Sequence, residues 1–235
     1  MKQVIQIRCK NNKKSQKVEI GSTLFDIFSA FDLKMTHGPV SARVNNKVEG
    51  MHYRVYNSKD VEFLDMTSSS GSRAYTRTLF FVLCKAVQDI YPATDVVIDI
   101  PVSNGFYVDI RLGRPVVDED VNIIRRRMQE IIDARMPIRR FTVPTEEAVA
   151  LFQEKGDVEK VKLLKTSGSI YTTYYKIGDY VDYYYGTLLT NTSQLYLFGL
   201  EKYYDGMLLR IPSLKNPDVL GEMTRQDKMF EIFKE

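Results

Sequence analysis

The chain has 235 residues, of which 44% are hydrophobic and 27% charged, and its formal net charge is +3. This composition is that of a globular protein able to bury a core, and the small net charge does not by itself indicate nucleic-acid binding. The charge is uneven: residues 1–67 carry about +4 and the remaining residues about −1, so any basic face belongs mostly to the N-terminal part.

The cysteines and the hydropathy of the sequence exclude two further classes of protein. Cys9 and Cys84 belong to no C-x-x-C motif, so neither a disulfide framework nor a zinc ribbon is expected. Charged residues interrupt the short apolar start, and no apolar run approaches the ~18 residues of a membrane span. We therefore expect a cytoplasmic protein with no membrane partner.

The first 66 residues have the element order of a ubiquitin-like β-grasp. Alternating apolar residues predict strands at 2–8 and 15–20, and a helix follows Gly21-Ser22. Further short strands are expected at 40–44 and 61–64. The lysines around the intervening Asn-Asn turn are interpreted as a solvated turn; they are Lys10, Lys13, Lys14 and Lys17.

Residues 67–72 are small and polar, which predicts a linker before a second α+β domain at 73–235. Apolar spacing then predicts a helix that ends at Tyr91-Pro92, and alternation predicts a strand from Val96. Asn104-Gly105 is a strong signal for a hairpin turn. The predicted domain is therefore a set of helices packed on an antiparallel sheet.

The remaining elements are expected in a regular order. Asp118 is expected to cap a helix, and a strand, two short helices, a β-rich stretch and a terminal amphipathic helix follow. Their expected ranges are 139–143 for the strand, 145–154 and 158–164 for the helices, 170–175, 180–185, 194–203 and 207–211 for the later strands, and 226–235 for the terminal helix.

Two parts of the sequence resemble regions of threonyl-tRNA synthetases. Residues 1–65 resemble the TGS domain, through Gly21-Ser22-Thr23-Leu24, Ile27 and the stretch 42–47. Residues 73–200 resemble the editing domain of the same enzymes. The matching stretches are 86–92, 104–109, 128–132, 137–140, 146–148 and 175–182.

The editing site of that family uses an H-x-x-x-H pair on a helix with a later Cys and His, a set that can share a metal or a water. Aligned through the matching stretches, these positions fall at Arg77, Phe81, Tyr184 and Leu188. None of these side chains can take the chemical role of the histidine or cysteine that the family has at the same position. The only histidines in the sequence are His37 and His52. The resemblance therefore implies a degenerate site, with no metal and no catalytic residue.

A residual cleft remains a prediction, with Arg77, Asn104, Tyr107 and Tyr184 converging on it. Packing by Phe81 and Leu188 could fill the former site, or Arg77 could hold an anionic ligand. Two further groups are each open to two interpretations: the arginines Arg125, Arg126, Arg127, Arg135, Arg139 and Arg140, and the tyrosine-rich stretch 171–185. The arginines are either a solvated, paired face or a phosphate contact, and the tyrosines either pack or stack on bases.

A second resemblance extends the first. A family of bacterial uridine (nucleoside) kinases carries the same pair of domains ahead of a P-loop kinase domain, and the stretches 72–81, 203–212 and 228–233 resemble it. No G-x-x-x-x-G-K-[ST] motif is present in the chain. The resemblance implies a parent kinase that uses ATP and Mg²⁺ in a domain beyond Glu235.

The leading hypothesis from the sequence is thus a non-catalytic regulatory region that binds RNA or a nucleotide in such a kinase. The alternative is a tRNA-binding or trans-editing module related to threonyl-tRNA synthetase, which would release amino acids from mischarged tRNA.

Overall fold

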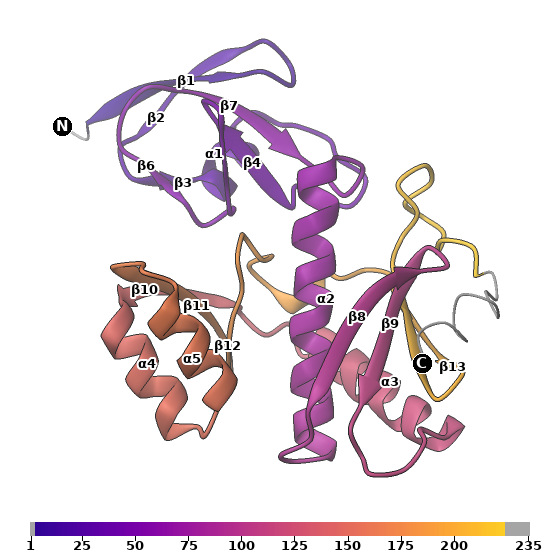
Figure 1. Cartoon of the computed structure of the whole chain (residues 1–235). Coiled ribbons are helices and arrows are strands. Elements are labelled where there is room, and N and C mark those ends of the chain that lie inside the picture. The colour runs from indigo at the N-terminus through magenta and orange to yellow at the C-terminus, as the bar shows by residue number, and fades with distance from the viewer. Residues whose placement is uncertain (1–2, 224–235) are drawn as a thin grey trace.

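The computed structural model describes residues 3–223, apart from the side chains of residues 99 and 100. Its elements are arranged around one long central helix, α2 (Ser69–Ile90). A five-stranded sheet lies beyond one end of α2, a three-stranded sheet with two helices lies on one side, and a four-stranded sheet with α3 lies on the other (Figure 1). The terminal helix predicted at 226–235 lies outside the described residues.

The N-terminal sheet has the order β2-β1-β7-β4-β5, in which β1 and β7 are parallel and the other pairs antiparallel. The bounds are β1 Val4–Cys9, β2 Ser15–Glu19, β4 Ser41–Val44, β5 Lys47–Glu49 and β7 Lys59–Leu64. Helix α1 (Leu24–Ala30) buries Leu24 and Ile27 in the same core, and β3 (Ser22–Thr23) pairs with β6 (Arg54–Val55). This mixed sheet with one helix confirms the predicted β-grasp.

Helix α2 begins inside the segment predicted as a linker. Ser68 caps it, because its hydroxyl accepts a hydrogen bond from the Gly71 amide at 3.0 Å. Gly71 is buried, and a Cβ there would lie 1.8 Å from the Asp65 carbonyl oxygen. Residues 69–72 therefore form the first turn of a 22-residue helix. The absence of a side chain at Gly71 allows the close contact with Asp65. The domain division itself stays a prediction.

The four-stranded sheet has the order β13-β14-β9-β8, and all its pairs are antiparallel. The bounds are β8 Val96–Val102, β9 Gly105–Ile110, β13 Gly199–Tyr203 and β14 Gly206–Arg210. The predicted hairpin forms, but its turn residues are Ser103 and Asn104, with φ of 52° and 56°. Two successive positive φ values define the turn that suits a two-residue hairpin, and Gly105 already belongs to β9.

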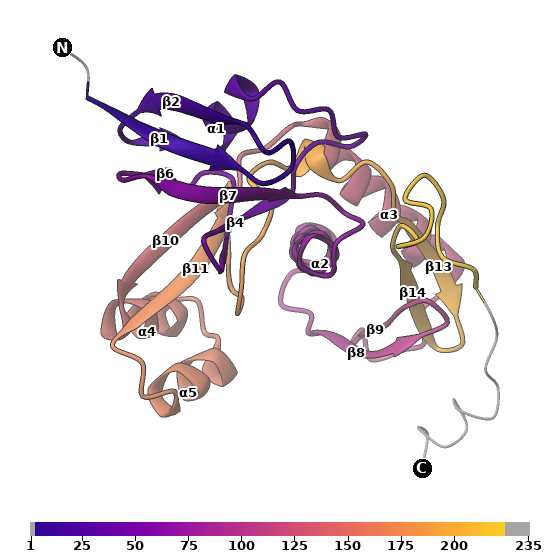
Figure 2. The same cartoon turned by 90° about the horizontal axis from the view of Figure 1, so that it is seen from above.

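Helix α3 (Asp118–Asp133) packs beside α2, and the two helices share a core with this sheet. The predicted cap was one residue off: Val117 is the N-cap and Asp118 is the first helical residue. The Asp120 carboxylate accepts from the Val117 amide at 2.9 Å and thereby satisfies a free N–H of the first turn. Seen along its axis, α2 lies between the N-terminal, three-stranded and four-stranded sheets (Figure 2).

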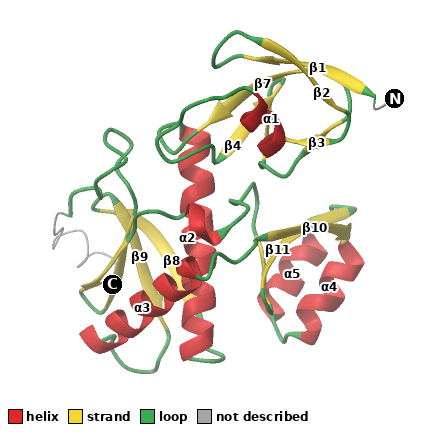
Figure 3. Ribbon diagram, turned by 180° about the vertical axis from the view of Figure 1, so that it is seen from behind, coloured by secondary structure: helices red, strands yellow, loops and turns green. Residues whose placement is uncertain are grey.

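The three-stranded sheet has the order β10-β11-β12, with bounds β10 Arg139–Pro144, β11 Tyr171–Ile177 and β12 Tyr180–Tyr183. Helices α4 (Thr145–Glu154) and α5 (Val158–Thr166) cover one face (Figure 3) and enclose Phe152 and Leu164. The strand predicted from 194 begins only at Gly199, since η1 (Thr192–Gln194) is a 3-10 turn held by Asn191. Within residues 3–223, no helix combines the length and apolarity needed to cross a membrane.

Candidate functional site

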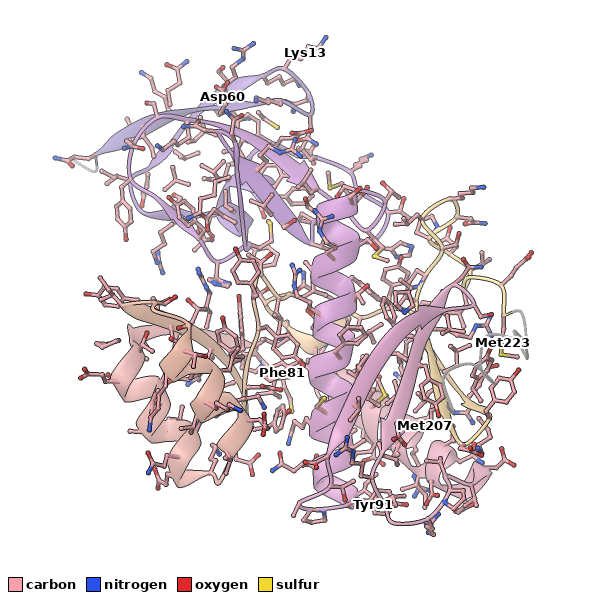
Figure 4. The ribbon with its side chains drawn as sticks, in the orientation of Figure 1. Lys13, Asp60, Phe81, Tyr91, Met207 and Met223 are labelled. Carbon is pink, nitrogen blue, oxygen red and sulfur yellow. The ribbon has the colours of Figure 1, made fainter. Side chains whose placement is uncertain are left out.

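The four positions assigned to the family's editing residues meet where α2 contacts the chain after β12. Phe81 is fully buried, and its ring lies 5.6 Å from that of Tyr184 and 5.2 Å from that of Tyr180. Leu188 is also fully buried in the same core. Figure 4 shows Phe81 on the side of α2 that faces the three-stranded sheet. Apolar packing therefore fills the space around Phe81 and Leu188.

Arg77 is half-buried and held by the backbone of the opposite loop. Its Nε and Nη2 atoms donate to the Thr187 carbonyl oxygen at 3.2 and 3.1 Å. Gly186 has φ of +111°, and a Cβ there would lie 2.8 Å from the guanidinium carbon. Burial lowers the pKa of Arg77, and the positive charge of Arg73 contributes to that lowering. The side chain stays protonated, because guanidinium pKa values lie far above neutral pH.

These residues do not fit a metal. Guanidinium is a permanent cation without a lone pair to donate, and Phe81 and Leu188 carry no donor atom. Among the residues that the structure describes, no group of three or more His, Cys, Asp or Glu side chains is arranged to hold an ion.

A polar cluster that the sequence analysis missed lies beside Tyr184. Lys160 Nζ is 2.9 Å from the Asp182 carboxylate, and the Tyr180 hydroxyl donates to the other Asp182 oxygen at 3.0 Å. Burial, with the nearby Asp182 charge, raises the pKa of the Cys84 thiol to about 12. A thiol with this pKa is protonated at neutral pH and is not a nucleophile. The cluster, at the edge of a cavity of about 810 Å³, gives no basis for acyl transfer.

A second cleft, which we call the arginine cleft, has a volume of about 490 Å³ and lies where the N-terminal sheet, α2 and the three-stranded sheet meet. Its charged lining residues are Lys47, Glu49, Arg73, Arg77 and Arg140, which give a net charge of about +3. Lys47 and Glu49 pair with each other at 2.9 Å. Within residues 3–223, no carboxylate lies at ion-pair distance from the three arginines. The uncompensated positive charge favours an anionic ligand.

The arginines converge from different elements. Burial raises the pKa of Tyr175, and the positive charges of Arg140 and Arg77 partly oppose that rise, so both guanidinium groups lie near its hydroxyl. The Tyr175 hydroxyl donates to the Gly186 carbonyl oxygen at 2.8 Å. Arg73 lies one helical turn before Arg77, a spacing that places both on one face of α2. That i, i+4 pair is a sequence signal that could have indicated this cleft, and it was not used for the prediction.

Some rings of the tyrosine-rich stretch are packed in the protein, and others are exposed. Tyr175 is buried, and Tyr174 stacks on Phe141 with ring centroids 5.2 Å apart, so these rings pack as the structural interpretation predicts. Tyr171 and Tyr185, by contrast, line the arginine cleft and are 64% and 90% exposed. Exposed aromatic rings beside cations are suited to stacking on bases.

Two of the four residues predicted to share a cleft do so. Arg77 and Tyr184 line the arginine cleft, but Asn104 and Tyr107 belong to the hairpin of the four-stranded sheet. The Asn104 amide donates to the Glu222 carbonyl oxygen at 3.2 Å, and Tyr107 packs against Tyr203. The predicted convergence was wrong for this pair, since the hairpin packs on a different face of α2.

The other charged runs lie elsewhere. Arg127 pairs with Asp89 and Glu130, both at 2.9 Å, which agrees with the interpretation of this helix as a paired surface. Figure 4 shows Lys13 at the top of the N-terminal sheet, and the lysines of that turn are exposed. Of the arginines predicted as possible phosphate contacts, Arg140 lines the arginine cleft, whereas Arg125, Arg126 and Arg127 do not; the lysines of that turn do not line it either.

Comparison with known proteins shows which class the chain resembles. No protein-family model matches the sequence. A threonine–tRNA ligase of Syntrophotalea carbinolica is 30% identical over 220 residues, which cover 89% of this chain and 34% of the relative. The corresponding enzyme of Clostridium kluyveri is 30% identical over 193 residues, or 81% of this chain and 30% of the relative. That of Acetivibrio thermocellus is 29% identical over 181 residues, or 77% of this chain and 28% of the relative.

The chain is therefore homologous to a part of threonine–tRNA ligases, and it spans about a third of the length of these curated relatives. The α+β fold with an N-terminal β-grasp agrees with that homology. The relatives support the resemblance to the TGS and editing regions. They give no support to the predicted uridine kinase parent.

Proposed function

We propose that this region binds tRNA or a tRNA-like RNA without hydrolysing an aminoacyl ester. The observation that carries the proposal is the arginine cleft, where Arg73, Arg77 and Arg140 have no carboxylate partner among the described residues. Phosphates supply most of the affinity of proteins for nucleic acids, and arginine binds them with two parallel hydrogen bonds. The relatives named as tRNA ligases support RNA as the partner.

The absence of hydrolysis follows from the side chains at the assigned positions. Hydrolysis of an ester requires a group that activates water or acts as a nucleophile. Phe81 and Leu188 are buried and apolar, Arg77 is a cation, and the Tyr184 hydroxyl has a pKa raised far above its usual range by burial. None of the four can take a proton from water at neutral pH.

The alternative of a trans-editing deacylase is the second candidate, and the names of the relatives favour it over the kinase hypothesis. A nucleoside kinase domain with ATP and Mg²⁺ remains a prediction from the sequence alone, without support from these relatives.

Binding of fluorescently labelled tRNA, measured by anisotropy, tests the proposal. Arg73→Ala with Arg140→Ala removes two exposed cations from the cleft, and we expect Kd to rise at least about tenfold at moderate salt. Arg139→Ala is the matched control, because Arg139 is the exposed neighbour of Arg140 and does not line the cleft. Equal Kd values for the wild type and the double variant would refute the proposed site.

Release of amino acid from seryl-tRNA distinguishes the two candidates. The proposal predicts a rate equal to that without protein, with or without added divalent metal. A protein-dependent release that Arg73→Ala and Arg140→Ala abolish would establish the deacylase instead.

A further inference from the structure

We infer that the arginine cleft also binds a free nucleotide with two or three negative charges, and that this nucleotide competes with RNA for the cleft. The competition rests on the proposed function; binding of the nucleotide does not. The ligand would be a mononucleotide with a terminal phosphate or diphosphate.

The net charge of the arginine cleft favours a ligand with more than one negative charge. The lining carries about +3, and its Lys47–Glu49 pair is already neutral, so the excess resides on the three arginines. One phosphodiester of an RNA backbone supplies a single negative charge. A terminal phosphate or diphosphate supplies two or three, and it therefore balances this group of cations within one small volume.

The way in which Arg77 is held also favours binding of an anion. Two of its nitrogens, Nε and Nη2, donate to the Thr187 carbonyl oxygen, which fixes the plane of the guanidinium. Its Nη1 is committed to no protein acceptor among the described residues. A guanidinium fixed on one edge loses little further freedom when its other edge binds an anion. The mutual repulsion of Arg73 and Arg77 is relieved when an anion lies between them.

The volume and the lining residues of the arginine cleft suit a mononucleotide. A volume of about 490 Å³ lies within the usual range for small-molecule sites. Ser70 and Thr173 line the cleft, and hydroxyl groups such as theirs are suited to phosphate or ribose oxygens. Tyr171 and Tyr185 offer exposed rings for the base. Since Lys47 and Val48 close the cleft from the N-terminal sheet, a bound nucleotide would touch both that sheet and α2.

Isothermal titration calorimetry with ADP, inorganic pyrophosphate and adenosine tests the inference on the whole 235-residue protein. We expect ADP to bind at micromolar to low millimolar Kd, pyrophosphate to bind more weakly, and adenosine not to bind. Arg73→Ala with Arg140→Ala should weaken ADP binding at least about tenfold, whereas Arg139→Ala should leave it unchanged. No heat with ADP, equal binding by the double variant, or binding of adenosine as tight as that of ADP would each overturn the inference.

A thermal shift gives a second readout, because a ligand that binds only the folded state raises Tm. ADP should raise the Tm of the wild type and of Arg139→Ala but not that of the double variant, whose Tm without ligand shows that it folds. Displacement of labelled tRNA by ADP then tests the competition. If tRNA binds and ADP neither binds nor displaces it, only this inference fails. If ADP binds and tRNA does not, the proposed function fails and nucleotide binding stands.

Discussion

The guanidinium of Arg77 occupies the space that a side chain at position 186 would need. Gly186 has φ of +111°, and its missing Cβ would lie 2.8 Å from Arg77 Cζ. The glycine allows both the unusual backbone and the close approach, so Arg77 can reach the Thr187 carbonyl oxygen. The backbone at Gly186 thus accommodates the long side chain of Arg77.

Gly186→Ala should therefore displace Arg77 and weaken tRNA binding severalfold. It should also cost about 1–3 kcal/mol of unfolding free energy, because alanine is strained at this φ. Gly156→Ala is the matched control: its φ is +74° and a Cβ there meets nothing within 4 Å. The control should lose about 1–2 kcal/mol and keep its affinity. Anisotropy and urea unfolding provide the two readouts, and equal affinity of the two variants would contradict the account.

Phe81→Ala tests whether Phe81 stabilises the core. Phe81 is fully buried beside Tyr180 and Tyr184, so its removal should cost about 3–5 kcal/mol in urea unfolding. Tyr185→Ala is the comparison, since this ring is 90% exposed and its loss should change stability by less than about 0.5 kcal/mol. A cost below about 1 kcal/mol for Phe81→Ala would show that the position is not part of the core.

Asp120 makes the stability dependent on pH. Its carboxylate accepts hydrogen bonds from Arg114 at 2.6 and 2.8 Å, from the Tyr91 hydroxyl at 2.6 Å and from the Val117 amide at 2.9 Å. Arg114 above all, with Tyr91 and the Val117 amide, holds the pKa of this carboxyl far below its usual range. A depressed folded-state pKa stabilises the protein above the unfolded value near 4, and this contribution is lost as the pH falls below it.

Asp120→Asn should accordingly cost about 1–3 kcal/mol at pH 7, with the deficit shrinking below about pH 4. Asp118→Asn is the control, because Asp118 is exposed in the same helical turn and makes no side-chain hydrogen bond among the described residues. Urea unfolding at pH 7, 5 and 3 measures both variants. A deficit that stays constant over this range would contradict the assigned network.

Cys84 should resist alkylation in the folded protein. Burial raises the pKa of its thiol to about 12, whereas an ordinary cysteine has a pKa near 8.5, so the reactive thiolate is scarce at neutral pH. Iodoacetamide at pH 8 should label Cys84 at least about a hundredfold more slowly than in urea, as followed by mass spectrometry of the peptide. Equal rates in both states would place the thiol outside the polar cluster.

Much of the fold was predictable because its signals are local. The alternation of apolar residues in β1 and β2 and the helical spacing in α2 and α3 follow directly from burial on one face. The boundary errors have physical causes. The start of α2 at Ser69 depends on packing of Gly71 against Asp65, and the cap of α3 depends on Asp120 reaching back to Val117. Neither contact is visible in composition or periodicity.

The candidate site was predictable only in part. The resemblance identified Arg77 and Tyr184, which line the arginine cleft, but the sequence did not place Lys47 or Arg140, itself predicted as a possible phosphate contact, beside them. These residues reach the cleft through tertiary contacts between β10, the N-terminal sheet and α2, and residues far apart in the sequence carry no common pattern. Asn104 and Tyr107 were assigned incorrectly for the same reason, since the side of α2 on which the β8–β9 hairpin packs is set by the whole core.

The salt dependence of tRNA binding tests the central claim most directly. If Arg73 and Arg140 contact phosphates, the slope of log Kd against log salt concentration should fall by about one for each arginine removed. Arg73→Ala with Arg140→Ala should therefore give a slope lower by about two, and Arg139→Ala a slope equal to that of the wild type. Equal slopes for all three proteins, or tRNA binding that does not depend on salt, would contradict a phosphate-binding arginine cleft.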